Sequence, residues 1–221
     1  MGEVVTNSRV TTDGWVYHTD TNFTVARGDI STTGTSSHFT MSSYPYAITA
    51  KYAAGRTTND YQIRRSFFDS RVYISTKGHV LSATLNVYLE NISLDLSPSN
   101  VVIPVFSTTL AGNSGDFGNI FNPPIGSILP LAAPQQVGGT PGYYSFPLSA
   151  SGLSLLQESI NTGTAFSFAL IDYNYDALNT QPSLGGDYTQ VEAHFQEYTG
   201  TTRDPYIECI IGNGLFFGAN F

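Results

Sequence analysis

The segment 81–90 constrains the fold most, because apolar and polar side chains alternate strictly along it. The apolar positions are Leu81, Ala83, Leu85, Val87 and Leu89, and the positions between them are Ser82, Thr84, Asn86, Tyr88 and Glu90. A period of two residues is typical of a β-strand with one buried face and one face toward water. The preceding Lys77-Gly78 pair favours a turn, since glycine reaches positive φ without steric cost.

Most of the chain shows similar short strands separated by turns. The segment 149–163 is the exception, with a rough helical face and a glycine that can end a helix. That face consists of Leu153, Leu155, Leu156 and Ile160, followed by Gly163. Pro104 inside the apolar run 101–106 predicts an edge strand or a bulge, and the alternation of the strand beginning at Phe166 slips at Ile171. Many short strands with one short helix predict an all-β fold, a β-sandwich or barrel.

The segment 111–142 is long and rich in glycine, proline and asparagine. Apolar residues are scattered through it, namely Phe117, Ile120, Phe121, Ile125, Ile128, Leu129 and Leu131. Long loops within compact domains are usually functional or disordered. The apolar side chains favour an ordered loop packed over one end of the sandwich. No repeat or linker divides the chain, so we expect a single domain over 1–211.

The composition argues against several classes of partner. Charged residues make up 12% of the 221-residue chain and the net charge is −8, so no basic face is expected that could grip nucleic acid. No apolar run approaches about 18 residues, so no membrane span is expected. The start "MGEVVTNSRV" lacks the pattern of a signal peptide. The single cysteine, Cys209, lies in the apolar run "YIECII" and is expected to be a buried thiol.

Four segments resemble, in order, parts of the DNRLRE-type jelly-roll modules. "RRSFFDSRVYISTKGHVLSATLNVY" (64–88) is similar to the family's Arg-x-Phe-Phe-Asp strand, loop and next strand. "PLSASGLSLLQESINTGTAFSFALI" (147–171) resembles its short helix and following strand, and "DPYIECII" (204–211) its closing strand. "DGWVYHTDTNFTVARG" (13–28) resembles the start of versions found in bacteriophage structural proteins. The chain departs from the family in the insertion 111–142, in an apolar C-terminal tail and in a helix without tryptophan.

The resemblance implies a jelly-roll β-sandwich that binds carbohydrate or forms part of a phage particle. The expected function is a non-enzymatic structural subunit of a bacteriophage particle, either a head or tail appendage or a decoration protein, located in the virion. The expected partners are other virion proteins, further copies of this chain as a homo-oligomer, and glycans of the host surface. The alternative function is a carbohydrate-binding module.

The neighbouring arginines Arg64 and Arg65 are difficult to place in a sandwich. Tyr61, Ile63, Arg65 and Phe67 share one parity, and Arg64, Ser66 and Phe68 share the other. One arginine therefore lies on or near a buried side unless a bulge shifts the phase, and a buried arginine is costly unless it is paired. We expect a structural ion pair between Arg65 and Asp69, its nearest carboxylate in sequence. Asp60, Asp172 and Asp204 are alternative partners across strands, and contact with a ligand is the alternative role.

The sequence offers little support for catalysis. The four histidines (His18, His38, His79 and His194) match no zinc-ligand spacing, and no G-x-S-x-G motif occurs. Neither an enzyme nor a cofactor is expected, and His194 is expected on a solvated sheet face. The turn "DYNYDALN" offers oxygen ligands in Asp172, Asn174, Asp176 and Asn179 but lacks the EF-hand pattern. Asp and Asn are equally expected in any turn, so a structural calcium ion stays unassigned.

Tyr173, Tyr175 and Asp176 are the candidate ligand-binding residues. Exposed aromatic rings beside polar groups suit a sugar, and a contact between subunits explains the two tyrosines equally well. For Trp15, the only tryptophan, packing in the core is expected.

The C-terminal tail "GNGLFFGANF" (212–221) is apolar and carries no charge. It contains Leu215, Phe216, Phe217 and Phe221, and each such side chain left in water forgoes about 1.5–3 kcal/mol of burial. We therefore expect the tail to dock on a neighbouring subunit as an assembly arm. The alternative is that it folds back over an edge strand of its own sandwich.

Overall fold

The computed structural model describes residues 2–39, 46–54, 59–72, 78–91, 100–108, 110–122, 127–182, 189–195 and 203–213. Its strands are β1 (Gly2–Asp20), β2 (Ser36–His38), β3 (Tyr46–Ala54), β4 (Asn59–Ser70), β5 (Gly78–Asn91), β6 (Val101–Phe106), β7 (Phe121–Asn122), β8 (Ser127–Ile128), β9 (Gln135–Gln136), β10 (Gly142–Pro147), β11 (Phe166–Asp172), β12 (Thr189–Ala193) and β13 (Tyr206–Asn213). Its helices are α1 (Phe23–Arg27), the 3-10 helix η1 (Ser114–Ile120), α2 (Ala150–Thr162) and the π-helical turn η2 (Tyr173–Ala177). The fold is mainly β, with two antiparallel sheets, consistent with a β-sandwich.

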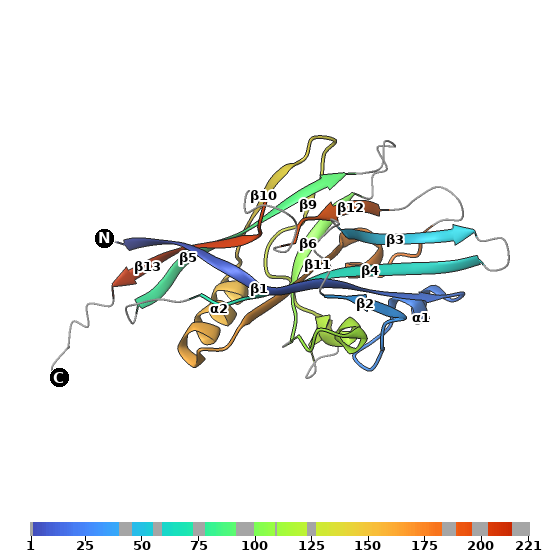
Figure 1. Cartoon of the computed structure of the whole chain (residues 1–221), viewed down its shortest axis with the longest axis horizontal. Coiled ribbons are helices and arrows are strands. Elements are labelled where there is room, and N and C mark those ends of the chain that lie inside the picture. Colours follow the sequence, from blue (N-terminus) through green and yellow to red (C-terminus); the bar gives the residue numbers. More distant parts are fainter. Residues whose placement is uncertain are drawn as a thin grey trace.

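The long strand β1 joins the two sheets. Its residues 2–9 pair with β13, and its residues 10–20 pair with β4. A second link is β12, which pairs with both β5 and β3. Figure 1 shows the result: β13, β5 and the start of β1 extend toward one end of the molecule, and β3 and β4 extend toward the other. The molecule is elongated for this reason.

The first core lies between the sheets. It collects buried side chains of β4, β6 and β11 from one sheet and of β5, β10, β12 and β13 from the other, and α2 packs against it. Its members include Trp15, Phe68, Leu85, Leu89, Phe146, Leu156, Phe166, Phe168, Leu170 and Phe195. The burial of Trp15 confirms the expected core role.

The predicted strand 81–90 lies within β5 and shows the expected alternation, except at its start. Ala83, Leu85, Val87 and Leu89 are buried, whereas Leu81 is 56% exposed. The cause is an irregularity in the pairing with β13, where Ile210 faces Ser82 but the next residue, Ile211, faces Val80. Leu81 is thus an extra residue of the bulge type, which points outward and leaves Val80 inside.

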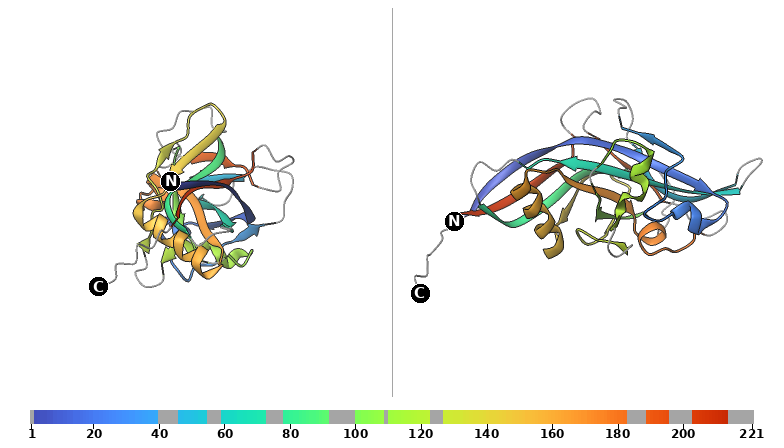
Figure 2. Two further views of the ribbon diagram at one scale, coloured as in Figure 1. Left: turned by 90° about the vertical axis from the view of Figure 1, so that its left-hand side faces the viewer. Right: turned by 90° about the horizontal axis from the view of Figure 1, so that it is seen from below.

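A second core covers the opposite face of β4, β6 and β11, where α1, η1 and η2 pack. Its members are Val16, Phe23, Ala26, Tyr61, Ile63, Phe67, Ile103, Val105, Phe117, Ile120, Phe121, Ala169, Ile171 and Tyr175. Every residue of β11 is buried, because Phe168 faces the first core and Ala169 the second. The slip of phase expected at Ile171 is therefore wrong: the strand is apolar on both faces. The right-hand view of Figure 2 shows β1 and β4 curving along the molecule.

The described part of the segment 111–142 is ordered, as expected, but it packs on both cores rather than over one end: Leu131 and Val137 belong to the first core. Phe117, Ile120 and Phe121 are buried in the second core. Leu131 N–H donates to the carbonyl of Pro104 at 2.9 Å. In an antiparallel ladder, the N–H and C=O of one residue point toward the same neighbouring strand. The side of Pro104 that lacks an N–H donor therefore faces the segment around Leu131. On this outer side β6 pairs only with the two-residue strand β9, through Val101 and Val102, so Pro104 lies close to the edge of the sheet, where its missing N–H was expected.

Helix α2 has the predicted extent. Ser149 caps its N-terminus by accepting from Gly152 N–H, and Gly163 ends it in the left-handed conformation at φ 69°. Leu156 is buried, and Leu153, Leu155 and Ile160 pack against the first core. Gln157 Oε1 accepts from Val80 N–H at 2.7 Å, so the helix also covers part of the edge of β5.

The boundary expected at 211/212 falls inside β13, which continues to Asn213. The remaining tail residues, with Leu215, Phe216, Phe217 and Phe221, lie outside the described residues.

Candidate functional site

Arg65 is fully buried in the second core, at 0% exposure. Its Nε and Nη2 donate to the two carboxylate oxygens of Asp176 at 2.7 and 2.8 Å. Nη1 donates to the carbonyl of Phe117 at 2.7 Å, and Nη2 also donates to that of Arg27 at 2.7 Å. The guanidinium carbon lies 3.9 Å from the centroid of the Phe117 ring. This bidentate pair with further acceptors is the arrangement that offsets the cost of burying an arginine.

The ion pair expected between Arg65 and Asp69 is thus wrong, and the partner is Asp176. Residues four apart on a strand lie about 13 Å from each other, so Asp69 is out of reach. Asp69 instead accepts a hydrogen bond from the Ser167 hydroxyl on β11. Burial raises the pKa of Asp69; the bond from Ser167 lowers it, while the nearby Asp116 carboxylate raises it again.

Arg27, at the end of α1, is the second cation at Asp176. Its Nε donates to the Asp176 carbonyl at 2.6 Å and lies 3.6 Å from the carboxylate. Burial lowers the pKa of Arg27, the Asp176 carboxylate raises it, and the Arg65 charge lowers it again. The Phe121 ring lies within 5.3 Å of both guanidinium groups. These contacts hold α1, η1 and η2 on β4, which gives the cluster a structural role.

The ligand site expected at Tyr173, Tyr175 and Asp176 does not form an exposed surface. Tyr175 is 7% and Asp176 1% exposed, and Tyr173 is half-buried against the second core. The local cause is η2, where the Asp172 carboxylate accepts a hydrogen bond from Tyr175 N–H and turns the chain inward. Within the described ranges, no three His, Cys, Asp or Glu side chains gather as a metal ion would need.

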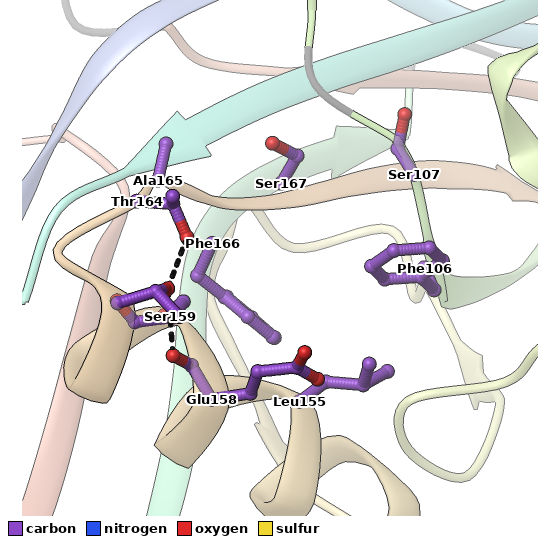
Figure 3. Close-up of a pocket in the computed structure, with 10 residues that line it drawn as sticks. Phe106, Ser107, Leu155, Glu158, Ser159, Thr164, Ala165, Phe166 and Ser167 are labelled. Atoms are coloured by element: carbon purple, nitrogen blue, oxygen red, sulfur yellow. Dashed lines mark hydrogen bonds between the residues drawn. The ribbon is translucent and has the colours of Figure 1, made fainter.

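A hollow of about 310 Å³ lies between the C-terminal half of α2 and the strands β6 and β11. Figure 3 shows Phe106, Leu155 and Phe166 around it with several hydroxyl-bearing residues. Those hydroxyls are occupied: Ser159 donates to Leu156 O and Ser167 donates to Asp69. Glu158 is the one ionisable group in this described lining. The hollow therefore offers a ligand few polar groups.

A wider hollow of about 750 Å³ lies between α2 and the start of β5. Leu81 lines it, and Ile210, on the neighbouring strand, is 38% exposed. Leu81 also lies over Gly212, since a Cβ added there would come within 3.1 Å of its side chain. We call Leu81, Ile210 and this hollow the apolar end. It lies where the chain leaves β13 toward the tail.

A third surface, which we call the tyrosine face, consists of Tyr88, Tyr143 and Tyr206 from three adjacent strands. Tyr143 on β10 lies directly opposite Tyr88 on β5, and Tyr206 on β13 lies opposite Asn86. The ring centroids of Tyr88 and Tyr143 are 5.5 Å apart at 88°, and those of Tyr143 and Tyr206 are 5.5 Å apart at 68°. Tyr143 is 40% exposed, and the other two rings are half-buried.

Polar groups surround the tyrosine face. The Arg203 guanidinium lies 4.6 Å from the Tyr88 ring centroid, and Ser145 Oγ donates to Asn86 Oδ1 at 2.6 Å. His194 Nε2 lies 2.6 Å from Glu90 Oε1, and the His194 side chain is fully buried, which corrects its expected place on a solvated face. Burial raises the pKa of Glu192, the Glu90 carboxylate opposite raises it further, and Arg64 lowers it.

Sequence reasoning missed the tyrosine face, although part of the signal was present. Tyr88 stands on the polar parity of the alternation 81–90, where only solvated residues were expected. In its own strand, Tyr143 stands on the opposite parity from the apolar residues Tyr144, Phe146 and Leu148. Their proximity depends on the register of β10 against β5, which no single strand pattern contains.

Neither protein-family models nor curated proteins give a match to this chain. No helix in the described ranges is long and apolar enough to cross a membrane.

Proposed function

We propose that this protein is a non-enzymatic structural subunit of a bacteriophage particle, a jelly-roll appendage or decoration protein that assembles through its apolar end and C-terminal tail. Four motifs resemble DNRLRE-type jelly-roll modules in order, and the first of them, 13–28, resembles versions found in bacteriophage structural proteins; this supports the choice of particle. The observation that supports a role in assembly is the exposure of two apolar residues, Leu81 and Ile210, near the start of the tail.

Two exposed apolar residues alone are ordinary on a soluble protein. Here Leu81 lines a hollow together with Val80 and Leu153, and the tail that follows β13 adds four large apolar side chains. Burying such groups against another subunit removes apolar area from water at about 25 cal/mol per Å². The proposal therefore places the contacts with other virion proteins, and with further copies of this chain, at this end.

Deletion of residues 214–221, and separately Leu81→Ser, tests the proposal. Both variants should keep the melting temperature of the full chain but lose its oligomer, measured by light scattering after size exclusion, or its incorporation into particles. Leu178→Ser is the matched control, since Leu178 is equally exposed at 56% and lies beside η2. A deletion that lowers the melting temperature by several degrees and leaves assembly intact would show that the tail covers its own sandwich, against the proposal.

A carbohydrate-binding role, through contact with glycans of the host surface, is the second candidate. The tyrosine face favours it, because a partly exposed aromatic ring beside charged and hydroxyl groups suits a sugar.

A further inference from the structure

The tyrosine face combines three properties that recognition of a sugar requires. It presents aromatic surface, since Tyr143 is 40% exposed at its centre. It is built on the paired strands β10, β5 and β13, so the rings are held by the sheet and lose little freedom on binding. Donors and acceptors stand at its edge in Arg203, Glu90 and the exposed Ser145, whose hydroxyl donates to the buried Asn86.

The orientation of the rings is fixed by contacts within the cluster. Tyr143 stands edge-to-face against both Tyr88 and Tyr206, and its hydroxyl donates to the Asp204 carbonyl at 3.1 Å. Burial raises the pKa of the Tyr143 phenol, so the hydroxyl remains protonated at neutral pH. The ring of Tyr143 is thus anchored at its polar tip, while the residue remains 40% exposed.

The charge around this face selects among ligands. Glu90 and Glu192 lie directly opposite each other on β5 and β12, and Glu208 is exposed on β13 near Thr84. The cations beside these carboxylates are Arg203, at the Tyr88 ring, and Arg64, which acts on Glu192, and the whole chain carries −8. An anionic ligand such as a phosphate chain or a sialylated glycan would meet net repulsion.

We propose that the tyrosine face binds a neutral hexose-containing glycan, with a sugar ring stacked on Tyr143 and its hydroxyl groups bonded to Glu90, Ser145 and Arg203. This proposal rests on the second candidate function and names its site and ligand class. A single site of this size binds a neutral sugar weakly, and the many copies on a particle would raise the avidity.

The test uses the full chain on a printed array of neutral hexose and N-acetylhexosamine oligosaccharides with sialylated and sulfated counterparts. Wild-type protein should bind neutral members, and Tyr143→Ala should weaken that binding by about tenfold. Tyr143→Phe keeps the ring and should stay close to wild type. Tyr173→Phe, which alters a half-buried tyrosine on another face, should also leave binding unchanged.

The outcomes separate the site from the function. Binding that survives Tyr143→Ala and Arg203→Ala would overturn this site while leaving a carbohydrate-binding role. A preference for the sialylated or sulfated members would overturn the ligand class. No binding to any member would overturn both the site and the second candidate function, whereas loss of assembly in Leu81→Ser would still support the particle role.

Discussion

At the scale of single residues, the buried pair of Arg65 and Asp176 makes the strongest prediction. Asp176→Asn leaves Arg65 fully buried without its carboxylate, and loss of one partner of a buried pair costs about 3–5 kcal/mol. We expect the free energy of unfolding, measured in denaturant, to fall by about that amount. A loss below about 1 kcal/mol would mean that the carbonyl acceptors and aromatic rings alone stabilise the cation.

Asp69→Asn should act in the opposite direction, and its effect should depend on pH. The pKa of Asp69 is raised in the fold, mainly by burial. A carboxyl group whose pKa is raised in the fold stabilises the folded state at a pH below its pKa in the unfolded chain, near 3.9. This stabilisation is lost as the pH rises through the pKa of the group in the folded protein. The variant removes the buried charge, so it should be more stable than wild type at neutral pH, and the difference should shrink as the pH falls toward 4. A constant difference across this range of pH would contradict the shift.

Cys209 gives a chemical test of the first core. Burial raises the pKa of its thiol to about 11, and only the thiolate reacts readily. We expect a thiol reagent at pH 8 to label the native chain very slowly and the chain unfolded in guanidinium chloride at once. Rapid labelling of the native protein would place Cys209 outside a closed core.

Residue patterns predicted the role of some side chains but not their partners. The parity of Arg65 against Ile63 and Phe67 indicated a buried cation. Its partner comes from η2, 111 residues further along the chain, and no local pattern carries such a separation. Tyr175 and Asp176 were expected to be exposed because their neighbours in sequence are polar. In the structure the turn η2 and the ion pair with Arg65 keep both side chains buried.

At the scale of elements, α2 was predictable because its signals are local. Its apolar spacing, Ser149 and Gly163 lie within one segment. β11 was harder to interpret, because a strand buried on both faces has no alternation to reveal which core each residue joins.

The cap of α2 gives a test at this scale. Ser149→Ala removes the acceptor for Gly152 N–H and should lower the free energy of unfolding by about 1 kcal/mol. Ser154→Ala, at an exposed position of the same helix, should instead raise it by up to about 0.5 kcal/mol through helix propensity. Equal effects of the two substitutions would refute the capping role of Ser149.

At the scale of the whole molecule, β4 supports both cores at once. Phe67 belongs to the second core and Phe68 to the first, so loss of either core exposes the other. We expect one cooperative thermal transition, with coincident midpoints in near- and far-ultraviolet circular dichroism. Two separated transitions would contradict the expected single domain.

The span of β1 also sets an order of events during synthesis of the chain. Residues 2–9 pair with β13, whose register begins at Tyr206 and ends at Gly212. A ribosome adds about 5–20 residues per second, so β13 is synthesised roughly 10–40 s after residues 2–9 of β1. During that interval one half of β1 has an open edge, which is a template for pairing with other chains. Residues 2–9 therefore pair only long after they have been synthesised, and the yield of the protein in a cell should depend on the chaperones present during that interval.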